Sequence, residues 1–437
     1  MIKVTGEVKK ALTLGEIKNS TETVEIEGAV HKLRDMGGFC FILVRTLSNV
    51  IQVVWDIENF GAYNCGEGDW VKIKGRVVAD ERSKLGFEIH GKEINVVSQA
   101  KHISPVPINK GKVHLHMDNH LKYRPLVLRN PKTRAIYKIQ EGICRGFREY
   151  LISQSFTEFH SPKIVAQGAE GGANIFKLEY FEKMAFLAQS PQFYKQAMVP
   201  VFGRVFEVGP VFRAEKHDTS RHLNEYTSLD FEMGFIDSFY DIMNMETAML
   251  AYTFELLNKE YSTELKLLDA VLPSAKDIPA VKFHDAKQLI AQKYNRPVRT
   301  YTDLEPDEER LLGKWSMEEH NSPFVFVTHY PSSARPFYTM DDPENPEVTL
   351  SFDLLLNGLE ITTGGQRIND YDMQIEKMKK LDMEIHDFKS YLMTHKYGTP
   401  PHGGLGLGLE RLTMQILRLD NIRFTTLFPR DINNLLP

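Results

Sequence analysis

Polar side chains that could bind a charged ligand alternate along residues 205–233, VFEVGPVFRAEKHDTSRHLNEYTSLDFEM. This segment reads as a strand, a charged loop and a returning strand. Alternate residues of a strand face the same side, so one face of the returning strand is polar. Its members are His222, Asn224, Tyr226, Ser228, Asp230 and Glu232. Such a face, with Arg213 and Glu215 on the incoming side, suits a nucleotide and a zwitterion. An ordinary amphipathic hairpin with one wet face would show the same alternation.

A second expected hairpin, residues 351–368, carries two acidic side chains. An Asn-Gly pair between two apolar runs is a strong signal for a two-residue turn. That turn would place Asp353 opposite Thr362 and make Asp353 and Glu360 diagonal neighbours on one face. Two carboxylates this close repel each other unless a cation lies between them. Their hard oxygen atoms predict a Mg²⁺ site, with a solvated hairpin face as the alternative.

A glycine-rich stretch, PPHGGLGLGLERLTMQILRL at residues 400–419, runs into a helix with Arg411 in its first turn. The glycines permit close approach of the backbone, and a cation beside a helix amino terminus favours a polyphosphate. The stretch lacks the GxxxxGK[ST] pattern, which excludes a Walker-type loop. His402 is a candidate phosphate contact. Taken alone, the stretch is equally typical of packing or of a flexible turn.

A third polar group stands at residues 186–199, FLAQSPQFYKQAMV, where an apolar strand leads through a proline into a helix. Ser190, Gln192 and Lys195 lie near this junction and could contact the same ligand. Lys195 by itself is equally typical of a solvated helix surface.

The composition bounds the class of protein. The chain has 437 residues, 42% of them hydrophobic and 25% charged, which predicts two or three globular domains. Its three cysteines are far apart, so we expect no disulfide framework and a reducing cytoplasm. We find no apolar signal segment at the amino terminus and expect no membrane association. The net charge of −5 excludes a generally basic nucleic-acid coat but not a local RNA groove.

The elements that position these residues fall into three segments. Residues 1–103 contain five short alternating runs separated by glycine-bearing turns, which predicts a barrel of the oligonucleotide-binding type. This segment holds as many Lys and Arg as Asp and Glu. Residues 104–132 read as a linker or hinge. Residues 133–437 begin with a helix over 133–154 and continue with hairpins and a second helix over 239–261. We therefore predict an α+β chain whose large domain is an antiparallel sheet flanked by helices.

Together these pieces resemble the class II aminoacyl-tRNA synthetases, specifically the aspartyl-tRNA synthetases of the compact archaeal type. SFTEFHSPKI with Pro162 is similar to the first family motif, FRAE and RHLNEY to the second, and GLGLGLERL to the third. The resemblance covers essentially the whole chain. It implies an N-terminal OB-fold β-barrel that binds the anticodon, a class II catalytic domain and a homodimer.

The resemblance also implies residue roles at the nucleotide. Arg213 would hold the ATP α-phosphate, Arg411 would hold the γ-phosphate, and both would be catalytic. Tyr226 would stack on adenine, and further ATP contacts would come from Glu215, Arg221, His222 and Glu360. Asp353 and Glu360 match the magnesium-binding carboxylates of the family.

In the amino-acid pocket, the resemblance implies that Lys195 and Arg367 hold the side-chain carboxylate of L-aspartate. The asparaginyl relatives do not present a lysine at the first position, and an amide would leave that ammonium poorly paired. Glu170 resembles the mobile loop that closes over the amino acid. The positions that bind the substrate ammonium and α-carboxylate are Ser190, Gln192 and Asp230.

In the barrel, Phe41 would stack on the central anticodon base of tRNA-Asp. Arg34, Gln52 and Glu88 would read base edges, although Phe41 could instead belong to the barrel core. The first alternative function is a relaxed enzyme that also charges tRNA-Asn and feeds an amidotransferase. His31 resembles the relaxed pattern and Lys84 the strict one. A second alternative is a non-charging paralogue, either an amide-forming ligase or an RNA-binding module.

Overall fold

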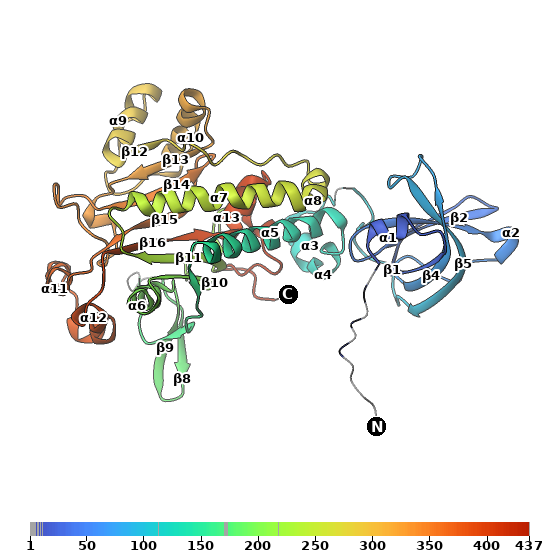
Figure 1. Ribbon diagram of the computed structural model, residues 1–437, viewed down its shortest axis with the longest axis horizontal. Coiled ribbons are helices and arrows are strands. Elements are labelled where there is room, and N and C mark those ends of the chain that lie inside the picture. The colour runs from blue at the N-terminus through green and yellow to red at the C-terminus, as the bar shows by residue number, and fades with distance from the viewer. Residues whose placement is uncertain are drawn as a thin grey trace. The chain divides into compact units, whose positions relative to one another are not determined.

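The computed structural model describes residues 6, 8, 10, 12–111, 113–169, 174–216 and 218–436. The chain divides into two compact units, residues 1–134 and 135–437 (Figure 1). Each unit is described by itself.

The first unit is a closed five-stranded barrel with the strand order β1-β2-β3-β5-β4, which confirms the predicted OB-fold. Its interior is apolar because alternate strand residues point inward, and Ile42, Val53 and Ile89 are neighbours across three strands. The elements are α1 (Leu14–Lys18), β1 (Thr23–Asp35), β2 (Phe39–Arg45), β3 (Val50–Asp56), α2 (Ile57–Phe60), β4 (Trp70–Ala79) and β5 (Phe87–Ser98).

The segment expected to be a linker contains two short helices, α3 (Met117–Lys122) and α4 (Arg124–Val127). Asn130 donates hydrogen bonds from its side-chain amide to the backbone oxygens of Ile108 and Lys110. These bonds hold part of the segment in one conformation. The boundaries of the three predicted segments remain a proposal.

The second unit is built on an eight-stranded sheet with the order β12-β13-β14-β15-β16-β11-β10-β6. Its central pairs are antiparallel as predicted, but β6 pairs with β10 and β12 with β13 in parallel, so the sheet is mixed. Both parallel edge strands are only two or three residues long. The strands are β6 (Thr157–Glu158), β10 (Arg204–Phe212), β11 (Glu225–Gly234), β12 (Ala280–Lys282), β13 (Phe324–Thr328), β14 (Ser351–Leu356), β15 (Leu359–Arg367) and β16 (His402–Gly408).

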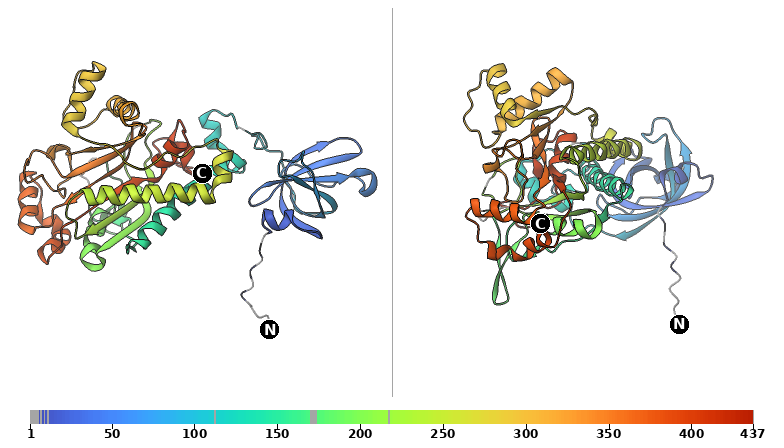
Figure 2. Two further views of the ribbon diagram at one scale, coloured as in Figure 1. Left: turned by 45° about the horizontal axis from the view of Figure 1, so that its top comes forward. Right: turned by 60° about the vertical axis from the view of Figure 1, so that its left-hand side comes forward.

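Two long helices, α5 (Pro131–Ser153) and α7 (Tyr240–Glu260), lie side by side along the sheet (Figures 1 and 2). Both agree with the predicted helices to within two residues. Close approach depends on Gly146, where a Cβ atom would lie 2.7 Å from Thr253 Oγ1 and 3.0 Å from its Cα. A larger residue there would push the two helices apart.

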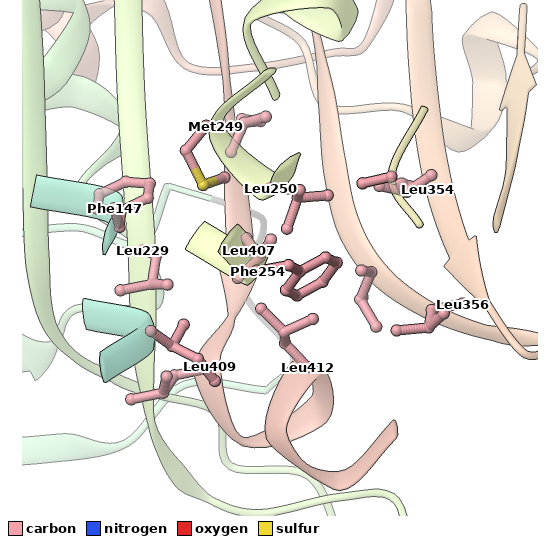
Figure 3. Packing of buried hydrophobic residues seen from close by; sticks show 14 of the residues in the cluster. Phe147, Leu229, Met249, Leu250, Phe254, Leu354, Leu356, Leu407, Leu409 and Leu412 are labelled. Carbon is pink, nitrogen blue, oxygen red and sulfur yellow. The ribbon is translucent and has the colours of Figure 1, made fainter. Parts of the chain in front are cut away.

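The main core fills the space between α7 and the sheet (Figure 3). Leu250 and Phe254 of α7 lie against Leu354 of β14, Leu407 of β16 and Leu412 of α13 (Leu409–Ile416). Because these sheet residues occupy one face, alternate residues of the same strands are left for the opposite face. That opposite face carries the polar groups described below.

The remaining elements surround the sheet. A separate three-stranded sheet has the order β7-β9-β8. No helix in the described part of the chain is long and apolar enough to cross a membrane. The other elements are β7 (Ile164–Val165), β8 (Lys177–Tyr180), β9 (Lys183–Leu187), α6 (Gln192–Phe202), α8 (Ser262–Leu267), α9 (Phe283–Tyr294), α10 (Pro306–His320), η1 (Ser332–Ala334), α11 (Tyr371–Lys380), η2 (Ile385–Phe388), α12 (Lys389–Lys396) and η3 (Ile422–Thr425).

Candidate active site

The register of four neighbouring strands places the predicted polar residues in one row. Asp353 of β14 pairs with Thr363 of β15, Thr363 with Gly406 of β16, and Gly406 with Asp230 of β11. Cross-strand partners share a face, so segments far apart in the sequence converge here. Gly406 leaves room in the row because a Cβ atom there would lie 3.1 Å from Asp230 Oδ1.

The register differs from the sequence-based expectation by one residue. The Asn357-Gly358 turn is present, with positive φ angles of 50° and 74°. However, the pairing shifts between Leu354 and Leu355, so Asp353 lies opposite Thr363 and the expected Thr362 partner is wrong. A bulge of this kind inserts one extra residue in one strand, which the two-residue turn alone does not reveal.

A pocket of about 390 Å³ opens on this face of the sheet. It brings together every residue predicted for ATP and amino-acid binding except Glu170, which lies outside the described residues. Asp353, predicted for the metal, is buried and does not line the pocket, although its cross-strand partner Thr363 does. The predicted residues that line the pocket are Ser190, Gln192, Lys195, Arg213, Glu215, Arg221, His222, Tyr226, Asp230, Glu360, Arg367 and Arg411.

The amino-acid end of the pocket holds two buried cations. Lys195 Nζ, from α6, is 2.9 Å from Asp230 Oδ1 and 2.8 Å from the backbone oxygen of Leu405. Arg367, at the end of β15, donates from Nε to Glu232 Oε1 at 2.9 Å and from Nη2 to the backbone oxygen of Gly404 at 2.9 Å. Both cations are therefore held in place before any ligand binds.

Glu232 was seen in the sequence only as part of the alternating face, and its role emerges here. It is fully buried. Burial alone would raise the pKa of Glu232, but the charges of Arg367 and Lys195 outweigh it and hold the pKa below its ordinary value. Its position depends on Gly404, where an added Cβ atom would collide with the Glu232 carboxylate and the Phe231 backbone oxygen.

The nucleotide end of the pocket is lined by arginines. Arg411 Nη1, in the first turn of α13, donates to the backbone oxygen of Glu360 at 3.1 Å and lies 3.5 Å from its Oε2. Arg213 lies over the Tyr226 ring at 5.9 Å. Arg221 pairs with Glu309 of α10, so a helix far along the chain also contacts the loop between β10 and β11.

The two carboxylates predicted to bind metal lie in a charged, buried setting. The pKa of Asp353 is raised to about 6 because burial, with the charge of Glu360 adding to it, outweighs the opposing charge of Arg335. Burial also opposes the charged form of Glu360, but Arg411 and Thr363 hold its pKa below the ordinary value. Asp353 Oδ1 is buried with no hydrogen-bond partner among the described residues.

This donor set fits a divalent cation that arrives with a polyphosphate. An unsatisfied buried carboxylate oxygen beside a second carboxylate offers two hard ligands, and phosphate oxygens and water would complete the shell. The described residues contain no group of three or more His, Cys, Asp or Glu that could hold a metal alone. The structure therefore supports a site shared with a ligand rather than a cage made by protein only.

Two further outcomes differ from what the sequence suggested. Arg335, just after η1, lies with Nη2 2.8 Å from Asp353 Oδ2 and lines the pocket, yet no motif drew attention to it. His402 is fully buried, with its nitrogens 2.9 Å from Gln196 Nε2 and 2.9 Å from the Pro400 backbone oxygen. A phosphate contact by His402 is therefore excluded.

The four predicted anticodon residues lie on the outward-facing sides of the barrel strands, where Glu88 is covered by its neighbours and buried. Arg34 of β1 pairs with Phe41 of β2, and both point away from the apolar interior. Gln52 of β3 donates from Nε2 to Glu88 Oε2 at 2.9 Å. Phe41 is half-buried on this outer surface, so it does not belong to the barrel core. An aromatic ring beside an arginine and an amide is typical of a surface that binds unpaired bases.

The two residues that gave opposite indications on tRNA choice lie in different settings. His31 occupies a bulge of β1, where the register shifts between Val30 and Lys32. Burial lowers its pKa to about 4, and the charge of Arg45 adds to this effect, so the ring is neutral. Lys84 lies exposed in the turn between β4 and β5.

Both units match known protein families. Residues 116–432 match the family described as tRNA synthetases class II (D, K and N), and residues 24–97 match the OB-fold nucleic acid binding domain. The aspartate–tRNA(Asp/Asn) ligase of Thermus thermophilus is 46% identical over 95% of this chain and 97% of the relative. The aspartate–tRNA(Asp) ligase of Pyrococcus horikoshii is 38% identical, covering 95% and 96%. The asparaginyl-tRNA synthetase of Pyrococcus horikoshii, solved with asparaginyl-adenylate, superposes with a TM-score of 0.90 at 31% identity, covering 98% of this chain and all of that one.

Proposed function

Because the chain belongs to the class II tRNA synthetases of the D, K and N group and is an aspartate–tRNA ligase, we propose that its pocket binds aspartate beside the two buried cations. Lys195 and Arg367 would face the side-chain carboxylate. Ser190, Gln192 and Asp230 would contact the α-carboxylate and ammonium groups. The two buried cations at this end of the pocket are the observation that supports aspartate, because each could make a charge-assisted hydrogen bond to a side-chain carboxylate that a neutral amide would not match.

ATP would occupy the arginine-lined end. Arg213 would contact the α-phosphate and Arg411 the γ-phosphate, while Tyr226 would stack on the adenine ring. Glu215, Arg221 and His222 would contact the nucleotide from the loop between β10 and β11. Glu170, in the segment before β8, would close over the amino acid.

The reaction would then need no nucleophile from the protein. An oxygen of the substrate α-carboxylate attacks the α-phosphorus, the bond to pyrophosphate breaks, and aspartyl-adenylate forms. A terminal hydroxyl of the tRNA next attacks the acyl carbon and AMP leaves. Arg213 and Arg411 stabilise charge that grows on the phosphate oxygens, so positioning and electrostatics provide most of the rate.

Asp353 and Glu360 would hold Mg²⁺ together with the ATP phosphates. When bound, the ion would neutralise phosphate charge and so assist pyrophosphate departure. Arg335, 2.8 Å from Asp353, would keep one oxygen of that carboxylate fixed while the unsatisfied oxygen faces the ion.

We further propose that the enzyme charges both tRNA-Asp and tRNA-Asn. His31 in the β1 bulge supports this proposal, as does the higher identity to the Thermus relative named for both tRNAs than to the Pyrococcus relative named for one. Lys84 favours the alternative, an enzyme strict for tRNA-Asp. Charging of tRNA-Asn would imply an amidotransferase partner that converts the product.

Charging of purified tRNA-Asp and tRNA-Asn transcripts with labelled aspartate, ATP and Mg²⁺ tests this proposal. We expect both transcripts to accept aspartate. Charging of tRNA-Asp alone would establish the strict enzyme and give Lys84 the deciding role. If neither transcript were charged by folded protein, the amide-forming ligase or RNA-binding paralogue would replace the proposal.

Replacing Phe41 with alanine should lower kcat/KM for tRNA charging by about tenfold, because a stacked base contributes about 1–3 kcal/mol. ATP–pyrophosphate exchange, which needs no tRNA, should stay near wild type. Trp70→Ala is a matched control, since this exposed ring lies at the opposite end of β4 from Val78, the neighbour of Glu88. Equal losses in both reactions of Phe41→Ala would contradict an anticodon role.

The proposal also implies a homodimer that works in the cytoplasm. Light scattering of the purified protein measures its molar mass and so tests the homodimer.

A further inference from the structure

A chain of buried hydrogen bonds runs behind the amino-acid end of the pocket. Gln192 Nε2 donates to Gln196 Oε1 at 3.0 Å, one turn along α6. Gln196 Nε2 lies 2.9 Å from His402 Nε2, and His402 Nδ1 lies 2.9 Å from the backbone oxygen of Pro400. All three side chains are at least 97% buried, so their hydrogen-bonding groups depend on each other rather than on solvent.

Each bond in this chain has a fixed direction. The Pro400 carbonyl can only accept, so Nδ1 of His402 carries the proton. Burial lowers the pKa of His402 to about 4, so the ring is neutral at pH 7 and its Nε2 accepts from Gln196 Nε2. The opposite end of the Gln196 amide, Oε1, must then accept from Gln192 Nε2.

Gln192, at the end of the hydrogen-bond chain opposite Pro400, lines the pocket. With Nε2 of Gln192 donating to Gln196, the end of the amide that remains for a ligand is the acceptor Oε1. We propose that Gln196 and His402 are positioning residues that fix the polarity of the Gln192 amide, so that Oε1 faces the substrate ammonium. This inference rests on the proposed function, because it assumes that aspartate binds with its ammonium group at Gln192.

The reverse orientation shows why polarity matters. An inverted Gln192 amide would place its NH₂ group against the ammonium, donor against donor, and its own Oε1 against Gln196 Oε1. Neither contact is a hydrogen bond, and both groups would be desolvated. Without the chain, the two orientations of Gln192 would be closer in energy and part of the protein would present the wrong end.

Tyr391 reaches the same network from another side and provides a control. Its hydroxyl is 3.2 Å from Gln374 Oε1 and 3.5 Å from Gln196 Oε1. Gln374 in turn donates to the Phe337 backbone oxygen at 3.0 Å. The hydroxyl has a single proton and its shorter bond is to Gln374 Oε1, so Tyr391→Phe should leave the bonds between Gln192, Gln196 and His402 intact.

The test compares aspartate with succinate, which lacks the ammonium group. In ATP–pyrophosphate exchange, Gln196→Met should raise KM for aspartate about tenfold or more, the effect of losing a hydrogen bond to a charged group. The inhibition constant of succinate and KM for ATP should stay within about twofold, since neither ligand uses Gln192 Oε1 against an ammonium. Tyr391→Phe should keep the wild-type ratio of KM for aspartate to the inhibition constant of succinate.

The other outcomes separate the inference from the proposed function. The positioning role is wrong if Gln196→Met folds and keeps the wild-type ratio of these two constants, whether both are unchanged or both rise by the same factor. If the wild type itself binds succinate as well as aspartate, the ammonium site of the proposed function is wrong. His402→Phe removes the acceptor from the other end of the chain, and the same change in ratio is expected if Gln196→Met does not fold.

Discussion

Replacing Arg367 with leucine should lower kcat/KM for aspartate in ATP–pyrophosphate exchange by roughly a hundredfold to a thousandfold. Removing one partner from a buried, hydrogen-bonded charge pair costs about 2–5 kcal/mol. Here the guanidinium is removed and the substrate carboxylate is left without its partner. Nε and Nη2 of Arg367 are bonded to Glu232 and Gly404, while Nη1 donates to none of the described residues. Nη1 is therefore the end that can meet the ligand. KM for ATP should change little.

The same substitution should also destabilise the fold. Glu232 is fully buried and its charge depends on Arg367 and on Lys195, whose Nζ is 3.5 Å from its carboxylate. Breaking a buried ion pair by removing one partner costs about 3–5 kcal/mol, because the other charge stays behind without compensation. A loss of activity in Arg367→Leu alone would then mix lost recognition with lost folding.

A double variant separates the two effects. Glu232→Gln removes the stranded charge, so Arg367→Leu combined with Glu232→Gln should recover much of the lost thermal stability. It should not recover aspartate activation, since no guanidinium faces the substrate. Recovery of activity together with stability would show that Arg367 acts only through the fold, and the pocket assignment would then be wrong.

The strand pattern predicted the site face correctly because alternation is a property of local sequence. The even-numbered residues between His222 and Glu232 share one parity, and three of them in β11, Tyr226, Ser228 and Asp230, line the pocket. The paired carboxylates were recognised from an Asn-Gly turn, but a bulge shifted the partner of Asp353. A bulge depends on the packing of neighbouring strands, which the two paired segments do not encode by themselves.

Other parts of the site carry no local signal. Arg335 lies in an irregular segment after η1, and Glu309 lies on a helix that the sequence places far from the loop it contacts. Their roles depend on which elements become neighbours in the sheet. His402 shows the converse limit: its type suggested a phosphate contact, but only the packing of β16 against α6 reveals that both its nitrogens are already engaged.

Glu246 on α7 presents a different kind of buried charge. It is fully buried on the helix face that covers the sheet, and neither carboxyl oxygen has a hydrogen-bond partner among the described residues. Burial raises its pKa to about 8, the nearby Thr362 hydroxyl opposes this rise, and the charge of Asp353 adds to it. The folded protein therefore holds a proton on Glu246 at neutral pH.

This proton links stability to pH in a defined direction. The folded state keeps the proton up to a pKa of about 8, whereas an unfolded chain releases it near the ordinary value of 4.5. The contribution of Glu246 to stability is fully present below pH 4.5 and is lost as pH rises through the folded pKa. A difference of one pH unit between the folded and unfolded pKa corresponds to about 1.4 kcal/mol in the free energy of unfolding.

Glu246→Gln should consequently stabilise the protein at alkaline pH. The amide has nearly the same shape and cannot ionise, so we expect a gain of about 2–4 kcal/mol in the free energy of unfolding at pH 8, shrinking towards zero near pH 5. Urea unfolding followed by circular dichroism across this range measures the difference. Glu255→Gln, at an exposed position on the same helix, should leave the pH dependence of the wild type unchanged. The outcome that would contradict this prediction is a free energy of unfolding for Glu246→Gln that follows the wild type at every pH. Glu246 would then lose its proton at the same pH in the folded and unfolded states, and its burial would not destabilise the protein at alkaline pH.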